Sequence, residues 1–384
     1  MIIKEISLTN WKNFEQVHAE CGRRCFIIGP NASGKSNFLD ALRFLREVAQ
    51  DGLQKAVTAR GGMKALRYLN ARKRPEVGVS VTLDDGWRYD LHFRSPKPSA
   101  SAGVSVSKEC VYRVDDDGRT STVLERPDID DKADPMRLSQ TALEQVNTNK
   151  SFREVADYFR SVRYIHILPQ VVRDPKSFSP VPSHNDPYGR DLVSQIWNTN
   201  EKTRTARLKR ISEALKPVVP QFRELSVEQD KATGLPHLKA KYTHWRPHGA
   251  FQNESLFSDG TLRLIALLWA MLDTSGPLLL EEPELSLHEE IVRQLPGMFA
   301  RLDKTKKRAA RQVFVTTHSR AMLEDSGIGS DEVLRLEQND NGSIIHTADR
   351  QDVSAMKDGL SAADVLLPKT SLGKRGQMFL DFAC

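Results

Sequence analysis

The sequence contains only four cysteines in 384 residues, and their arrangement is not that of a metal site. Cys21 and Cys25 flank two arginines, Cys110 and Cys384 stand alone, and none is paired with a histidine at a metal-ligand spacing. We therefore expect Cys21 and Cys25 to lie in a strand that enters the core, without a redox function.

Long apolar runs are also missing. No segment approaches the length that crosses a membrane, and residues 1–20 include acids and no signal-peptide core. The sequence therefore predicts a cytoplasmic protein that does not enter the membrane. Hydrophobic residues make up 39% of the chain and charged residues 28%, which is typical of a globular protein, and the length predicts two lobes of one module.

A glycine-bounded loop, Gly29 to Ser36, matches the pattern of a phosphate-binding loop. It follows an apolar run at 25–28 that is short enough for a buried strand. It precedes apolar residues at helical spacing between 38 and 49. In a strand–loop–helix unit, backbone N–H groups and the helix N-terminus converge on phosphates, whereas a plain glycine-rich turn does not need this context. The sequence therefore predicts an ATP site here.

Within this segment, Lys35 is expected to bridge the β- and γ-phosphates, and the hydroxyl of Ser36 to complete the ligand shell of Mg²⁺. The residues assigned to nucleotide binding are Gly29, Pro30, Asn31, Ala32, Ser33, Gly34, Lys35, Ser36 and Asn37.

Two further apolar runs end in polar residues. Leu278–Leu280 leads into Glu281 and Glu282, and we expect Glu281 to hold a water bound to Mg²⁺ and Glu282 to act as general base toward the attacking water. Two acids in isolation would suggest a solvated strand end, but a phosphate loop upstream favours the catalytic interpretation. The run 313–315 leads into His318, which could contact the γ-phosphate if the other segments form the site.

The segment Ser258–Thr261 precedes a strongly apolar helix. Ser258 is expected to cap this helix, and Gly260 to permit close backbone approach. Such a helix N-terminus is a second phosphate-binding end, and we expect it to serve the nucleotide of a partner subunit. Taken alone, the segment would be an ordinary helix cap.

In combination, these segments resemble the ABC-type ATPases that include RecF, the SMC proteins and the OLD-type ATPases of bacterial defence. GPNASGKS is similar to the Walker A motif of that group, SDGT to its signature, LLLEEPE to its Walker B motif with the catalytic glutamate, and TTHS to its switch-histidine segment. ELSLH at 284–288 stands where the group has its D-loop. The resemblance covers the chain from residue 1 to about residue 340.

The resemblance implies further site residues. Lys12 and Asn13, in the opening segment ISLTNWKNF, would lie near the nucleotide. Gln140 is our candidate for the glutamine that contacts the metal in this group, with Gln170 as its rival. The Walker B acid is Glu281 rather than the usual aspartate, a departure that leaves the rate of hydrolysis open.

The fold class expected from these patterns is α/β, an ABC-ATPase-type P-loop fold with a mixed sheet, antiparallel β hairpins and a helical lobe. Residues 77–93 alternate about an Asp-Asp-Gly turn and predict a hairpin, with a second around 116–118. Residues 136–163 and 190–216 are expected to be helical, and acids at 115–117 and 128–131 to form turns. The predicted parts are 1–76 with Walker A, 77–125 with the hairpins, 126–250 as a helical lobe, 251–340 with the remaining motifs, and a tail at 341–384.

The chain carries a formal net charge of +6, and its basic residues cluster. Such clusters either bind DNA phosphates without sequence preference or form solvated helix faces. No helix-turn-helix or zinc finger stands out, so sequence-specific reading of DNA is not expected. The clusters are Lys202, Arg204, Arg207, Lys209, Arg210 and Lys216; Lys304, Lys306, Lys307, Arg308 and Arg311; and Arg67, Arg72, Lys73 and Arg74.

The resemblance implies an ATPase that forms a head-to-tail homodimer around two nucleotides, in which Ser258 and Gly260 contact the nucleotide of the opposite subunit. OLD-type enzymes carry a nuclease domain after the switch histidine, whereas the sequence after His318 is short. We therefore expect a separate effector or nuclease, or DNA, as the partner in defence against phage. The alternatives are a RecF-like repair ATPase and a nucleotide-gated scaffold with little turnover; a transporter motor is disfavoured by the long segment between Walker A and the signature.

Overall fold

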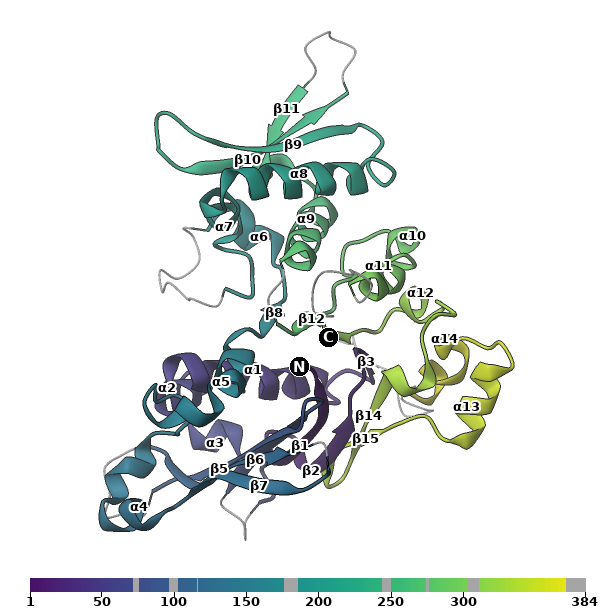
Figure 1. Cartoon of the computed structure of the whole chain (residues 1–384). Coiled ribbons are helices and arrows are strands. Elements are labelled where there is room, and N and C mark those ends of the chain that lie inside the picture. The colour runs from purple at the N-terminus through teal and green to yellow at the C-terminus, as the bar shows by residue number, and fades with distance from the viewer. Residues whose placement is uncertain are drawn as a thin grey trace, which may run out of the picture. The chain divides into compact units, whose positions relative to one another are not determined.

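The computed structural model describes residues 1–71, 76–96, 103–115, 117–175, 186–243, 250–273, 276–302 and 311–370. The chain divides into two compact units, Met1–Val162 with Thr316–Cys384, and Arg163–Val315. Among the described residues, no helix is both long and apolar enough to cross a membrane. Figure 1 shows both units, with their helices and strands labelled where there is room.

The first unit is built on an antiparallel sheet in the order β2-β1-β4-β5-β6-β7 and on a smaller group in the order β15-β14-β3. Its strands are β1 (Ile3–Trp11), β2 (Phe14–Glu20), β3 (Arg24–Ile28), β4 (Val77–Leu83), β5 (Trp87–Arg94), β6 (Ser105–Val114), β7 (Thr120–Arg126), β14 (Val333–Asn339) and β15 (Gly342–His346). Its α-helices are α1 (Lys35–Asp51), α2 (Leu53–Thr58), α3 (Met63–Leu66), α4 (Ile129–Ala133), α5 (Arg153–Arg160), α12 (Arg320–Leu323), α13 (Arg350–Lys357) and α14 (Ala362–Val365). Short 3₁₀ turns are η1 (Pro135–Ser139), η2 (Thr148–Phe152), η4 (Ser330–Glu332) and η5 (Leu367–Thr370).

Helix α1 is held by aromatic packing. Phe44 lies with its ring centroid 5.1 Å from that of Trp11 on β1 and 5.3 Å from that of Phe93 on β5, and all three side chains are fully buried. Burying one such side chain stabilises a fold by about 2–3 kcal/mol. The predicted apolar face of α1, including Phe38 and Leu42, is buried, which confirms the helix expected after the phosphate loop. This packing fixes α1 against the sheet and so positions the loop that precedes the helix.

The second unit contains short parallel strands and a separate three-stranded sheet. The strand order β13-β12-β8 joins β13 (Val313–Thr316), β12 (Leu278–Glu281) and β8 (Arg163–Ile165), while β11 (Ala250–Asn253), β10 (Pro236–Tyr242) and β9 (Phe222–Gln229) form the other sheet. The helices are α6 (Pro169–Arg173), α7 (Leu192–Asn198), α8 (Glu201–Leu215), η3 (Glu254–Leu256), α9 (Asp259–Leu272), α10 (Glu289–Val292) and α11 (Leu295–Arg301).

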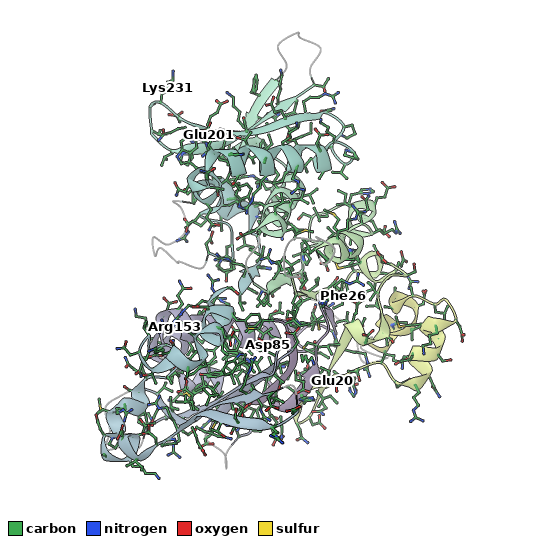
Figure 2. The ribbon with its side chains drawn as sticks, in the orientation of Figure 1. Glu20, Phe26, Asp85, Arg153, Glu201 and Lys231 are labelled. Atoms are coloured by element: carbon green, nitrogen blue, oxygen red, sulfur yellow. The ribbon has the colours of Figure 1, made fainter. Side chains whose placement is uncertain are left out.

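Helix α8 runs along the β9–β11 sheet (Figure 1). Its apolar residues are buried, and the Ser212 hydroxyl joins the two layers because it donates to Leu208 O at 2.9 Å and accepts from Leu225 N of β9 at 2.9 Å. Figure 2 places Glu201 at the start of this helix and Lys231 in the turn between β9 and β10. The segment 126–250 was predicted as a helical lobe, but it also contains the β9–β11 sheet. Strands β9 and β10 contain few apolar residues, so the alternation that one solvated face normally produces is not evident in the sequence.

The hairpins predicted at 77–93 and around 116–118 are confirmed as β4–β5 and β6–β7. The helix predicted over 136–163 is wrong for its first half, which forms η1 and turns before η2 and α5. The cause is Glu109, a fully buried carboxylate that accepts hydrogen bonds from Ala142 N at 2.7 Å and Leu143 N at 3.0 Å. These N–H groups satisfy the buried charge instead of a helical ladder.

Candidate functional site

The phosphate loop joins β3 to α1, as the sequence predicts. Gly34 stands before the first helical residue, Lys35, with a left-handed φ of 99°. The first turn of α1 contains no acidic residue, so the positive end of the helix dipole is not neutralised by its own side chains. A 17-residue helix that begins in this way provides oriented N–H groups for an anion.

Lys35 and Ser33 line the interior of the loop. Lys35 is 7% exposed, and its Nζ donates to Gly29 O and Pro30 O, each at 3.1 Å. The Ser33 Oγ is buried and has no hydrogen-bond partner among the described residues. A buried ammonium and an unsatisfied hydroxyl in one loop fit a phosphate ligand, because the ligand's charge balances that of the ammonium and its oxygens accept from the hydroxyl. The hydroxyl of Ser36 and the carboxylates downstream are oxygen donors of the kind that Mg²⁺ prefers.

Asn13 braces the loop from the side. Its Nδ2 donates to Ser33 O at 3.2 Å and to Ser343 Oγ at 2.6 Å, and its Oδ1 accepts from Asn37 Nδ2 at 2.7 Å. A Cβ on Gly34 would overlap the Asn13 amide. The close approach therefore requires glycine at position 34. The structure brings Asn13 and Asn37 to the loop, where the resemblance and the motif had put them.

Lys12 lies next to the loop but pairs with helix α1. Its Nζ is 2.7 Å from Asp40 Oδ2, and Arg60 contacts the same carboxylate at 2.8 Å. Burial alone would raise the pKa of Asp40, but the charges and hydrogen bonds of Arg60 and Lys12 outweigh it and hold that pKa below its usual value. Lys12 thus fixes the first turns of α1, and its nucleotide contact stays a prediction.

The switch segment Thr316–Ser319 follows β13. Thr317 N donates to Ile27 O of β3 at 3.2 Å, which places this segment beside the strand that enters the phosphate loop. His318 is exposed, and Ser319 caps α12 by accepting a hydrogen bond from Met322 N at 3.3 Å. The role of His318 as a sensor of the γ-phosphate stays a prediction.

In the second unit, Glu281 ends β12 and Glu282 begins the loop after it. The hydroxyl of Tyr164 on β8 donates to the Glu281 carboxylate, and His166 Nδ1 lies 3.3 Å from Glu281 O. Strand register explains the first contact, since Leu279 pairs with Tyr164 and Leu280 with Ile165. Glu282 has a φ of 42°, a conformation that side chains other than glycine adopt rarely and that is concentrated at functional sites.

The signature helix begins as predicted. Ser258 is the N-cap of α9, and its Oγ accepts from Thr261 N at 3.2 Å. A Cβ on Gly260 would lie 2.5 Å from Ser286 O, so glycine permits direct contact between the signature and the D-loop segment. Ser286 itself has a φ of 62°. Like Glu282, it is a non-glycine residue in the left-handed region, and both fall inside motifs.

Gln140 and Gln170 occupy different places. Gln140 follows η1 in the first unit, where its side chain is exposed and its carbonyl accepts from Arg126 Nη1 at 2.9 Å. Gln170 lies on α6 in the second unit and is also exposed. Both metal assignments stay predictions.

Of the first acid cluster, Asp115 and Asp117 are described and lie in the expected turn, whereas the turn predicted at 128–131 is wrong because these residues begin helix α4. Asp115 Oδ1 accepts from Arg119 N at 2.8 Å in the β6–β7 turn. Asp128 caps α4 with a capping box, and the buried Asp131 is paired with Arg126 at 2.9 Å. Across the part of the chain that the structure describes, no group of three histidine, cysteine or acidic side chains is arranged to hold a metal ion. Cys25 lies in β3 as predicted, whereas the prediction is wrong for Cys21, which lies between β2 and β3; Cys21, Cys25 and Cys110 are buried and form no disulfide.

The family model described as "AAA domain, putative AbiEii toxin, Type IV TA system" matches residues 25–324, a span that contains the phosphate loop, both glutamates and His318. The chain belongs to this AAA domain family. A second model, "P-loop containing region of AAA domain", matches residues 3–46. The predicted membership of the RecF- and SMC-like ATPases is confirmed at the level of an AAA-family P-loop ATPase domain. No curated protein sequence matches the chain.

Solved structures similar to this AAA domain include SMC heads. An SmcHead bound to the C-winged helix domain of ScpA superposes with a TM-score of 0.53 at 16% identity, covering 91% of this chain and 99% of that one. An Smc head with an extended coiled coil, bound to the C-terminal domain of ScpA and derived from Pyrococcus furiosus, gives 0.50 at 13% identity, with 93% and 98% covered. At this identity the similarity establishes the fold.

Sequence reasoning missed Tyr164. The AAA domain places this tyrosine on a three-residue strand that is too short for a periodic pattern. The only signal was a short run of apolar and aromatic residues near position 164. Reasoning from the sequence also missed Asp40 and Arg60, whose pairing needs α1 and the segment after α2 to be adjacent.

Proposed function

We propose that this AAA domain binds and hydrolyses ATP with Mg²⁺, and that two copies close head to tail on ATP. The observation that carries the proposal is the phosphate loop: a buried Lys35, an unsatisfied Ser33 hydroxyl and an N-terminus of α1 without acids, braced by Asn13. Family membership and the order of the four motifs support it.

Each residue has a defined role in the proposal. The backbone N–H groups of the loop and Lys35 bind and orient the phosphates of ATP. Ser36 and Glu281 hold the metal, with Gln140 as a further candidate, and bound Mg²⁺ supplies charge neutralisation of the phosphates. Glu282 accepts a proton from the attacking water, and His318 contacts the γ-phosphate. Ser258 and Gly260 present the N-terminus of α9 to the nucleotide of the opposite subunit.

Hydrolysis then opens the closed dimer, because the contacts that hold it depend on the γ-phosphate. We propose that this switch controls a separate effector or nuclease, or DNA binding, in defence against phage. SMC heads have been solved with ScpA bound, which fits an ATPase that acts through a partner protein.

The test is the molar mass of the Glu282→Gln variant in solution with and without ATP and Mg²⁺. The variant removes the general base and is expected to double its mass with nucleotide, because the closed dimer persists. Ser258→Arg in the same background should abolish the doubling. Ser361→Arg is the matched control, since Ser361 also caps a helix of the described chain, α14, and loses a similar cap without changing the signature.

A mass that never responds to nucleotide contradicts the switch. ATP turnover measured in parallel separates the alternative functions. A nucleotide-gated scaffold would bind ATP and dimerise but hydrolyse little ATP, even with Glu282 intact. A RecF-like repair ATPase would instead show turnover that depends on DNA.

A further inference from the structure

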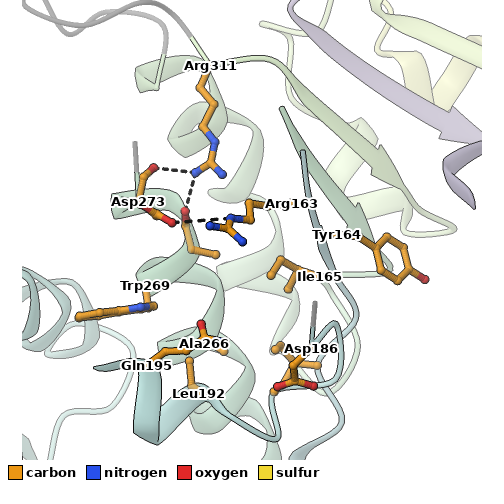
Figure 3. A pocket seen from close by; sticks show the side chains of 13 residues that line it. Arg163, Tyr164, Ile165, Asp186, Leu192, Gln195, Ala266, Trp269, Asp273 and Arg311 are labelled. Atoms are coloured by element: carbon orange, nitrogen blue, oxygen red, sulfur yellow. Dashed lines mark hydrogen bonds and ion pairs between the residues drawn. The ribbon is translucent and has the colours of Figure 1, made fainter. Parts of the chain in front are cut away.

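We propose that the second unit contains a binding pocket for a small phosphate ester, distinct from the phosphate loop. The pocket encloses about 330 Å³ between β8, α7 and the end of α9, within the size range of small-molecule sites. Figure 3 shows Arg163 and Arg311 at one end of it and Asp186 at the other. The proposal goes beyond the ATPase function and does not depend on it.

Three arginines surround one carboxylate at the cationic end. Arg163 Nε lies 4.0 Å from Asp273 Oδ2, and Arg207 Nη2 lies 3.7 Å from Asp273 Oδ1. Arg311 Nη1 donates to the backbone carbonyls of Asp273 at 2.7 Å and Ala270 at 2.5 Å, so it does not neutralise the carboxylate by direct contact. A single negative charge against three positive charges leaves an excess that an anion would balance.

The arginine end also contains unused donors. Arg163 Nε and Arg311 Nη2 are buried and have no hydrogen-bond partner within the described parts of the chain. Burial lowers the pKa of Arg311 to about 10, because the opposing charge of Asp273 does not offset burial together with the charges of Arg163 and Arg207. The guanidinium remains charged at neutral pH, at a cost that a bound anion would relieve. Guanidinium groups match the geometry of phosphate oxygens and bind them in a bidentate manner.

The rest of the pocket suits the body of a phosphate ester. Leu192, Ala266 and Ile165 provide an apolar middle, and Gln195 adds an amide (Figure 3). Trp269 borders the same space, and Arg207 stacks on its ring with 5.1 Å between guanidinium carbon and centroid. Asp186 accepts backbone N–H groups of Tyr188 and Asp191, and burial raises its pKa. It can accept a further hydrogen bond from a hydroxyl or amino group.

The pocket lies beside β8, the strand whose Tyr164 donates a hydrogen bond to Glu281. Side chains alternate along β8, and in Figure 3 Tyr164 points away from Arg163 and the arginine end. A ligand on one face of β8 therefore sits one residue from the tyrosine that binds the Walker B glutamate on the other.

The experiment uses the full chain with Lys35→Ala, which removes the phosphate-loop ammonium, and AMP as probe. Calorimetry is expected to show one AMP per chain. Arg163→Gln should weaken binding at least tenfold, whereas Arg293→Gln, an arginine of the same unit outside the pocket, should leave it unchanged. Inorganic phosphate and ribose 5-phosphate form the other arms, and the ester should bind more tightly than inorganic phosphate.

Hydrogen exchange on the unmodified chain gives a second readout that does not need Lys35→Ala to fold. AMP should protect residues 163–165 and 266–273. No AMP binding at millimolar concentration, equal weakening by Arg163→Gln and Arg293→Gln, or inorganic phosphate binding as tightly as AMP overturns the proposal. Because the phosphate loop is disabled in the calorimetric arm, failure of ATP hydrolysis would leave this result unaffected.

Discussion

At the scale of single residues, the loop depends on close contacts that only particular side chains allow. Gly34 has a left-handed φ, and the amide of Asn13 occupies the space that a Cβ at this position would need. The two constraints are separable, because Gly62 has a φ of 81° and open space around it. This pair of glycines distinguishes backbone strain from steric overlap.

Gly34→Ala is expected to destabilise the protein by more than Gly62→Ala and to abolish ATP binding, since Asn13 or the loop must move. Gly62 combines its φ of 81° with a ψ of −174°, and this backbone conformation alone is expected to cost an alanine about 1–3 kcal/mol. Thermal unfolding and nucleotide titration measure both. Adding Asn13→Ala to Gly34→Ala should restore part of the stability, and a purely additive double variant would contradict the overlap.

The pairing of Asp40 predicts a dependence of stability on pH. Its folded pKa lies below the unfolded value of about 3.9, so its contribution is fully present above that pH and is lost as pH falls through the folded pKa. Asp40→Asn removes a charged partner of Arg60 and should cost about 1–3 kcal/mol at pH 7.

Denaturant unfolding of both proteins between pH 3 and pH 8 checks this. The difference in unfolding free energy should stay constant from pH 8 to about pH 5 and shrink below about pH 4. A difference that grows toward acid would mean that the carboxyl is protonated in the folded protein.

At the scale of elements, periodic and bounded segments were predictable and contact-dependent ones were not. Strand β3, the loop and α1 follow from an apolar run, a glycine pattern and helical spacing, all of which are local. The turns at 140–147 follow from Glu109, a residue more than thirty positions earlier. Strands β9–β11 pair with their neighbours along the chain, but they contain few apolar residues and so show no clear alternation in the sequence. The site follows the same rule. The helix cap formed by Ser258 could be predicted from its local sequence, whereas Tyr164, the partner of Glu281, lies on β8 and could not.

Strand β8 therefore carries the next prediction. Tyr164→Phe removes the hydroxyl that donates to Glu281 and should leave ATP affinity unchanged while it lowers kcat about tenfold, the effect of losing one hydrogen bond to a charged group. The Mg²⁺ concentration for half-maximal activity should rise in parallel, which a merely structural role would not cause.

Tyr242→Phe is the control, because Tyr242 is a half-buried tyrosine of β10 that packs against Phe222. Both variants should melt at similar temperatures. An unchanged kcat and Mg²⁺ dependence in Tyr164→Phe would show that Glu281 is positioned without the tyrosine.

At the scale of the whole molecule, charge is the property that the sequence described least well. Of the basic cluster on α8, Arg204 stacks on Trp197, Arg207 is paired with Asp273, and Lys216 is paired with Glu213. Arg72, Lys73 and Arg74, with the residues Lys304, Lys306, Lys307 and Arg308, lie outside the described residues. Lys202, Lys209 and Arg210 are exposed on α8 and are the residues available for phosphates.

If this surface binds DNA, affinity should fall with salt irrespective of sequence, because each neutralised phosphate releases condensed counterions. Reversing Lys202, Lys209 and Arg210 to glutamate should reduce the slope of log affinity against log salt by about 0.9 for each lost contact on duplex DNA. The matched control reverses Lys4, Lys108 and Lys132, which are exposed in the first unit and change the net charge equally.

Comparing the two triple variants separates a local surface from the general attraction of a basic protein. If the α8 residues form a local DNA-binding surface, only the α8 variant should show a smaller slope of log affinity against log salt. The slope depends on the number of phosphate contacts and not on the net charge of the protein. Equal losses would assign the attraction to the formal charge of +6 as a whole, and the α8 residues would then be a solvated helix face. Fluorescence anisotropy between about 50 and 200 mM salt measures the salt dependence of DNA affinity for both triple variants. Duplexes of two unrelated sequences should give the same slope if α8 contacts phosphates and not bases.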